Sequence, residues 1–218
     1  MRVVIAGGHG KVALLLERLL AERGDQAVGL IRNPAHVADV QQAGAEAVVC
    51  DLEAASADDV AALLSGAAAV VFAAGAGAGS GAPRKDSVDR AASVLMADAA
   101  ERAGVRRFVQ ISSMGAGQPP QPGTDEVWAA YITAKTAAED DLRSRDLDWT
   151  IVRPGGLTDA PPTGRIQLAA PPVPRGTVPR ADVAAVIAAL LDEPGTRHKT
   201  LELTGGDSPV AAAVRGIS

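Results

Sequence analysis

Short runs of apolar, often β-branched residues alternate with longer stretches of helical character along most of this 218-residue chain. The runs are apolar at consecutive positions, which is typical of strands buried on both faces of a parallel sheet. The predicted strands are 2–6, 27–31, 47–50, 69–74, 107–112, 149–154 and 200–205. The predicted helices are 11–23, 34–43, 57–65, 87–103, 126–145 and 181–191. This alternation predicts an α/β fold, a doubly wound parallel sheet in a single domain over residues 1–218.

Two segments interrupt the alternation. Residues 75–85 are rich in glycine and predict a mobile loop. Residues 158–183 contain six prolines and little periodicity, so we expect an irregular excursion there. We place this excursion over the carboxyl-terminal edge of the sheet, where open α/β sheets bind ligands, and therefore on the substrate side of the domain.

Composition and charge exclude several classes of partner. The net charge of −5 and an aromatic content of 2% argue against nucleic acid and against an anionic membrane surface. No apolar run reaches the length of a membrane span, and the N-terminus lacks the pattern of a signal peptide. The single cysteine, Cys50, fits a reducing compartment. We expect a cytoplasmic protein, a monomer or homodimer, whose partner is a small-molecule substrate.

A glycine-rich loop follows the first predicted strand. Gly7, Gly10 and Ala13 fit the pattern G-x-x-G-x-x-G/A, and an amphipathic helix begins at once. The first glycine permits a tight turn, the second lets the backbone approach a pyrophosphate, and the small third residue allows close helix packing. The pattern predicts a dinucleotide phosphate site whose residues are Gly7, Gly8, His9, Gly10, Lys11 and Val12. The alternatives are a tight turn without a ligand and, for His9, a solvent-exposed loop position.

The end of the second predicted strand bears on the choice of cofactor. Sheets that bind NAD usually place an acidic residue there to bind the ribose 2′-hydroxyl. This chain has Arg32 in the sequence LIRNP, with no acidic residue nearby. Arginine suits a 2′-phosphate, so NADP is favoured over NAD. The alternative is that Arg32 is a solvated loop charge before Pro34.

Seven segments in order, AGGHGKVA, LIRNP, CDLE, VFAAG, RFVQISS, YITAK and IVRPGGLT, resemble the short-chain dehydrogenase/reductase superfamily. The chain is most similar to the compact, atypical members related to NAD(P)-dependent epimerase/dehydratases, the NmrA-like group. The resemblance implies a Rossmann fold and a nicotinamide cofactor. It also implies further cofactor contacts. Asp51 and Leu52 would lie near the adenine, and Ala73, Ala74 and Gly75 near the ribose and pyrophosphate. Pro154, Gly155 and Gly156 would lie beside the nicotinamide.

The same resemblance implies a set of active-site residues. Tyr131 and Lys135 match the family's Tyr-x-x-x-Lys pair, and Ser113 corresponds to its hydroxyl, with Ser112 as the less favoured alternative. Asp89 lies where most relatives carry an active-site asparagine, which departs from their usual proton relay.

The spacing of the Tyr–Lys pair supports this chemistry independently, since residues four apart share one face of a helix. A nearby ammonium favours the phenolate, so Tyr131 could exchange a proton with a substrate oxygen while hydride moves to or from the nicotinamide. We predict an NADP(H)-dependent oxidoreductase that acts on a small carbonyl or alcohol. The alternatives are a non-catalytic NAD(P)-binding regulator or redox sensor, and an epimerase or dehydratase that uses transient oxidation. The isolated histidines and single cysteine predict no metal site.

Overall fold

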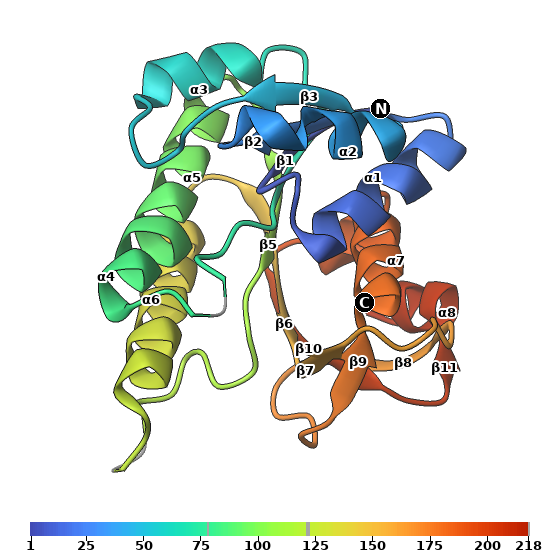
Figure 1. Ribbon diagram of the computed structural model, residues 1–218. Coiled ribbons are helices and arrows are strands. Elements are labelled where there is room, and N and C mark those ends of the chain that lie inside the picture. The colour runs from blue at the N-terminus through green and yellow to red at the C-terminus, as the bar shows by residue number, and fades with distance from the viewer. Residues whose placement is uncertain (78, 121–122, 218) are drawn as a thin grey trace.

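The computed structural model describes residues 1–77, 79–120 and 123–217. Within these residues, one nine-stranded sheet has the order β3–β2–β1–β4–β5–β6–β10–β8–β11 (Figure 1). Its parallel part consists of β1 (Arg2–Ala6), β2 (Gln26–Ile31), β3 (Glu46–Val49), β4 (Ala69–Phe72), β5 (Arg107–Ile111), β6 (Asp148–Pro154) and β10 (Lys199–Gly205). This order reverses between β1 and β4, as in Rossmann sheets, and confirms the predicted fold.

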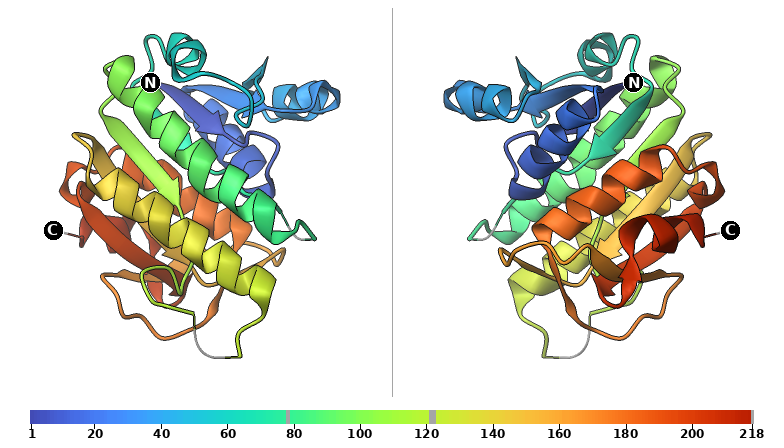
Figure 2. Two further views of the ribbon diagram at one scale, coloured as in Figure 1. Left: turned by 90° about the vertical axis from the view of Figure 1, so that its left-hand side faces the viewer. Right: turned by 90° about the vertical axis from the view of Figure 1, so that its right-hand side faces the viewer.

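Helices cover both faces of the sheet (Figures 1 and 2). One face packs against α1 (Lys11–Glu22), α2 (Val37–Gln42), α7 (Arg180–Leu191) and α8 (Val210–Arg215). The other packs against α3 (Ala57–Leu63), α5 (Ala92–Arg102) and α6 (Glu126–Arg143). The neighbouring residues Val3 and Val4 of β1 are both fully buried, in the cores on opposite faces. Burial on both sides explains why the strands are continuously apolar.

Helical structure begins earlier after β4 than predicted. Residues assigned to the loop 75–85 form the short helix α4 (Ala82–Arg84), and a π-helical stretch, η2 (Lys85–Ala91), leads into α5. Pro83 suits a first helical turn, and the Asp86–Arg90 ion pair bridges one turn of η2. The consequence is that Lys85 and Asp89 are buried side chains of one helical stretch.

The segment 158–183 is more regular than predicted. It contains β8 (Arg165–Ala169) and β9 (Thr177–Pro179), and β9 pairs with β7 (Gly156–Thr158) in a small second sheet. The prediction of an irregular segment was wrong for β8, which pairs antiparallel with β10 and buries Ile166 and Leu168 between exposed positions. Prolines on both sides and a length of five residues concealed this strand in the sequence.

The remaining elements are short. The predicted helix 34–43 is divided into η1 (Pro34–His36) and α2, and η3 (Pro194–Thr196) precedes β10. Near the C-terminus, β11 (Ser208–Pro209) pairs antiparallel with β8 and leads into α8. Neither β11 nor α8 was predicted, because their few residues show no clear period.

Candidate functional site

Two adjoining hollows lie where the sheet order reverses, at the carboxyl ends of the parallel strands. The first, which we call the β2 pocket, has a volume of about 310 Å³ and is lined by the end of β2 and the loop after β3. The second, the α6 cleft, has a volume of about 840 Å³ and is lined by η2, α6 and the end of β6. Both are bordered by Gly10 and by residues 73–75 after β4. One elongated ligand could therefore occupy both hollows.

The glycine-rich loop forms the border between the hollows and is held close to β2 and to the segment after β4. Gly7 has a φ of +78°, and a Cβ on it would lie 2.6 Å from the Cα of Ala74. A Cβ on Gly8 would lie 2.6 Å from the Cα of Gly29 in β2. Gly10 precedes α1, whose N-terminus receives no side-chain cap. The free N–H groups and positive dipole end of α1 therefore face the border, as a phosphate site requires.

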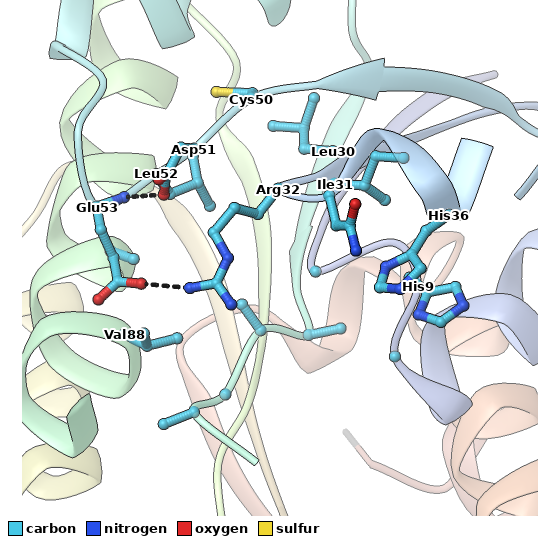
Figure 3. Close-up of a pocket in the computed structure, with 18 of the residues that line it drawn as sticks. His9, Leu30, Ile31, Arg32, His36, Cys50, Asp51, Leu52, Glu53 and Val88 are labelled. Carbon is cyan, nitrogen blue, oxygen red and sulfur yellow. Dashed lines mark hydrogen bonds and ion pairs between the residues drawn. The ribbon is translucent and has the colours of Figure 1, made fainter. Parts of the chain in front are cut away.

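The β2 pocket contains an acidic residue that the local sequence around Arg32 did not reveal. A guanidinium nitrogen of Arg32 lies 2.9 Å from Oε2 of Glu53, which follows β3 (Figure 3). The prediction that no acidic residue lies near Arg32 was therefore wrong in space, although it holds along the chain. Arg84 of α4 contacts the same oxygen at 2.8 Å. Two arginines thus share one carboxylate.

Ser87 fixes the orientation of this carboxylate. Its hydroxyl donates to Oε1 of Glu53 at 2.6 Å. This hydrogen bond, with the two guanidinium groups, holds the pKa of Glu53 below its usual range. Glu53 is therefore a stable anion at neutral pH, and Arg32, whose side chain is 54% exposed, is its ion-pair partner at the surface.

The other predicted residues of the β2 pocket form its walls. The rings of His9 and His36 stack with centroids 3.5 Å apart (Figure 3). Nε2 of His9 lies 2.8 Å from a carboxylate oxygen of Asp39. Asp51 accepts a hydrogen bond from the Glu53 N–H at 3.0 Å, and Leu52 lines the same pocket. These contacts place the predicted adenine-side residues around one hollow.

The α6 cleft brings together the predicted active-site residues. Tyr131 and Lys135 on α6 line it with Ser113 after β5 and Asp89 on η2. The Lys135 Nζ lies 5.8 Å from the centroid of the Tyr131 ring, donates to the Ile111 carbonyl at 3.2 Å, and lies 3.2 Å from Oδ1 of Asp89. Lys135 and Asp89 are therefore an ion pair, and the Tyr131 ring lies near the Lys135 ammonium.

The structure separates the two candidate serines. Ser112 is buried and donates to Oε1 of Glu139 at 2.6 Å. The Ser113 hydroxyl has only a 3.3 Å contact with the adjacent Met114 carbonyl among the described residues, so it can turn toward a ligand. This geometry favours Ser113, in line with the sequence.

The predicted nicotinamide-side residues Pro154, Gly155 and Gly156 line the far wall of the α6 cleft. A Cβ on Gly155 would lie 2.3 Å from the Gly176 carbonyl oxygen. The glycines therefore let the chain pass tightly from β6 into β7. Lys11, which also lines the cleft with Val12, contacts Asp159 just after β7 at 2.6 Å.

Several residues of the site were missed in the sequence, among them Glu53, Arg84 and Lys85. Glu53 and Arg84 lie 21 and 52 positions from Arg32, and no local pattern connects them. Lys85 was assigned to a loop, although its four-residue spacing from Asp89 is a helical signal that could have placed both on one face. Its Nζ lies 5.3 Å from the centroid of the Tyr131 ring.

Known proteins share this sequence and this architecture. Residues 7–194 match the profile of the NAD(P)H-binding family. An uncharacterized sugar epimerase, YhfK of Bacillus subtilis, is 34% identical over all of both chains. A solved candidate NAD-dependent epimerase/dehydratase of Bacillus halodurans is 35% identical, with a TM-score of 0.91 over 99% of each chain. The oxidoreductase ylbE of Lactococcus lactis is 28% identical, with a TM-score of 0.86 over 99% of this chain and 96% of its own.

The chain belongs to the NAD(P)H-binding family, among the compact proteins related to epimerase/dehydratases and oxidoreductases. The resemblance to atypical short-chain dehydrogenase/reductases is confirmed. A nicotinamide nucleotide fits the site, because the glycine cradle, the uncapped end of α1 and the two adjoining hollows match the order of phosphates and rings in such a molecule.

The described residues show neither a metal-binding cluster nor a membrane-spanning helix. They contain no group of three or more His, Cys, Asp or Glu residues arranged to hold a metal ion. None of their helices is long and apolar enough to cross a membrane.

Proposed function

We propose that this protein is an NADP-dependent oxidoreductase that acts on a small carbonyl or alcohol substrate. The observation that carries the proposal is one continuous cleft in which Ser113, Tyr131 and Lys135 lie beside the glycine-rich loop. The β2 pocket would hold the adenosine end of the cofactor. The α6 cleft would hold the nicotinamide end and the substrate.

The side chains of the α6 cleft have distinct roles in this proposal. The nicotinamide, when bound, supplies or accepts the hydride. Tyr131 gives a proton to the substrate oxygen during reduction and takes it back during oxidation. Ser113 donates a hydrogen bond to the same oxygen. Lys135, fixed by Asp89 and the Ile111 carbonyl, supplies positive charge beside the Tyr131 ring.

The arginines of the β2 pocket support NADP over NAD. Arg32 and Arg84 bring two guanidinium groups together at the Glu53 carboxylate, and the Asp51 carboxylate lines the same pocket. A 2′-phosphate carries up to two negative charges and can be held by a guanidinium through two hydrogen bonds. Each arginine is at least 40% exposed on its side chain, so both can turn from Glu53 toward a phosphate.

A cofactor titration followed by a substrate panel tests the proposal. Calorimetry with NADPH, NADP⁺, NADH and NAD⁺ should show tighter binding of the phosphorylated pair. A panel of aldehydes and ketones is then tested with NADPH, and the reaction is monitored by the loss of NADPH absorbance. At least one of these carbonyl compounds should be reduced. Binding of NAD⁺ and NADP⁺ with equal affinity would contradict the cofactor assignment.

One observation favours a second candidate, a nucleotide-binding regulator without turnover. Asp89 neutralises Lys135 in a buried pair, which weakens the cation that the proton transfer uses. Tight NADPH binding with no NADPH oxidation on the carbonyl panel would support this candidate.

Because YhfK is named a sugar epimerase, the panel should also include nucleotide sugars with NAD⁺ and NADP⁺. In these reactions the formation of the epimer is measured.

A further inference from the structure

Lys85 differs from the other cations of the α6 cleft. Four cationic side chains line the cleft, and Lys11, Lys135 and Arg180 each have a carboxylate partner within 3.2 Å. The Lys85 Nζ instead donates to the Gly77 carbonyl at 2.9 Å and has no carboxylate within 4.0 Å among the described residues. Lys85 is only 8% exposed. A buried ammonium without a counter-ion is costly, so this position calls for an anion from outside the chain.

The mouth of the same cleft is apolar and exposed. The described residues include five exposed large hydrophobic side chains, and three of them line this cleft: Val127, Trp128 and Leu157, at 41, 47 and 40%. The Trp128 and Tyr131 rings lie 5.3 Å apart and tilted, so together they offer an aromatic wall. Exposed apolar side chains gathered around a cleft mark a binding surface for apolar ligand groups.

We propose that the α6 cleft takes a substrate with an apolar, ring-containing body and an anionic group, and that Lys85 binds that group. This inference rests on the proposed function, because it assigns the open part of the cleft to the substrate. The ring packs against Trp128 and its neighbours at the mouth. The anion lies deeper, on the Lys85 ammonium beside the Tyr131 ring, near the oxygen that Tyr131 would protonate.

The cofactor's pyrophosphate is the other possible source of an anion. The structure argues against it, because the glycine-rich loop and the N-terminus of α1 already offer phosphate donors at the border of the two hollows. Lys85 lies in η2, which packs against α6 on the Tyr131 side of the cleft. An experiment must still distinguish these two sources.

Three probes separate charge from shape: 2-naphthoate, its neutral analogue 2-naphthalenemethanol, and acetate. Calorimetric titrations use the full chain, alone and with excess NADP⁺, in wild type, Lys85→Met, Trp128→Ala and the control Lys199→Met. Lys199 begins β10, at the opposite end of the parallel strands. Because no hydride transfer is required, failure of the proposed reaction leaves these titrations readable.

The wild type should bind 2-naphthoate at least about tenfold more tightly than the neutral analogue, and acetate only weakly. Lys85→Met should abolish this preference while NADP⁺ affinity stays unchanged, and Lys199→Met should preserve it. Trp128→Ala should weaken both naphthyl probes. Lys85→Met should also melt no lower than the wild type, because a buried unpaired ammonium is replaced by an apolar chain of similar length.

Equal affinity of the two naphthyl probes for the wild type, or an unchanged preference in Lys85→Met, would overturn the proposal. Joint loss of NADP⁺ binding and probe preference would also overturn it, since the anion would then be the cofactor's phosphate. If Lys85→Met fails to fold, Lys85→Gln replaces it, because an amide can still donate to the Gly77 carbonyl. The same loss of preference is expected.

Discussion

The Lys135 ammonium lies 3.2 Å from Oδ1 of Asp89, and neither side chain is more than 4% exposed. Oδ2 of Asp89 accepts the Ala76 N–H at 3.2 Å. The pair therefore ties α6 to η2 and to the glycine-rich stretch after β4. Because both residues line the α6 cleft, the stability of this region depends on the lysine that we propose for the active site.

Asp89→Asn should destabilise the protein by about 3–5 kcal/mol, because it leaves a buried ammonium without its counter-ion. Urea unfolding of wild type, Asp89→Asn, Lys135→Met and the double variant measures the coupling. The double variant should recover much of the loss, since it removes both charges. Additive effects in this cycle would mean that the two groups do not interact energetically.

Glu17 on α1 makes folding depend on pH. Its side chain is fully buried, and its two carboxylate oxygens have no hydrogen-bond partner in the described structure. Burial raises the pKa of Glu17 from 4.5 to about 8. Between these values the unfolded chain loses this proton while the folded chain keeps it, so stability should fall as pH rises from 4.5 to 8 and change little above.

The loss attributable to Glu17 over that range should be on the order of 3–5 kcal/mol. Urea unfolding of Glu17→Gln at several values from pH 5 to 9 isolates it. The variant should show a flatter profile and greater stability than the wild type at pH 8. Parallel profiles for the two proteins would show that Glu17 does not titrate in this range.

Gly10→Val should reduce nicotinamide nucleotide affinity by about 100-fold or more, because its side chain enters the space in which the phosphate meets α1. A Cβ at Gly10 already lies 3.1 Å from the Gly7 carbonyl oxygen. Gly81→Val is a matched control at the glycine before α4, where a Cβ meets only the Pro83 ring at 3.6 Å. Equal nucleotide affinity in the two folded variants would refute the phosphate site.

Arg32→Ala should lower NADPH affinity by about 10- to 150-fold, the value of a hydrogen bond to a charged group, and leave NADH almost unaffected. Glu53→Gln should act in the opposite direction, because it frees both arginines for the 2′-phosphate. Calorimetry of both cofactors on three proteins measures the ratios. The effects should shrink at high salt, since these side chains are exposed. An unchanged NADPH/NADH ratio in both variants would contradict the account.

The parallel core was predictable from local sequence patterns, and the resemblance to a known family supplied the predicted residues of the cleft. Continuous apolar runs indicate the strands of a sheet that is covered on both faces. The glycines at positions 7 and 10, between an apolar run and an amphipathic stretch, indicate a phosphate-binding loop at the start of a helix. The family resemblance implied that Ser113 and Gly155 belong to one site, and both line the α6 cleft. Strand β8 was not predicted, because it is flanked by prolines and because its partner strand β10 is distant in the sequence.

Charge pairing could not be predicted, since it depends on distances in space. Glu53 reaches Arg32 across 21 positions, and Lys135 reaches Asp89 across 46. The orphaned carboxyl of Glu17 likewise resembles an ordinary exposed helix residue in the sequence. The inward direction of Lys85 was also missed, because residue 85 was assigned to the glycine-rich loop although it begins the helical stretch η2.

The most direct test of the proposed function compares Tyr131→Phe with wild type on a carbonyl substrate identified with NADPH. Removing the hydroxyl should lower the rate of NADPH oxidation by about 10²–10⁴, the usual contribution of a general acid. The NADPH dissociation constant should stay the same, because the ring and its packing against Trp128 remain. A Phe variant with full activity on that substrate would contradict the assignment of Tyr131 as the proton donor.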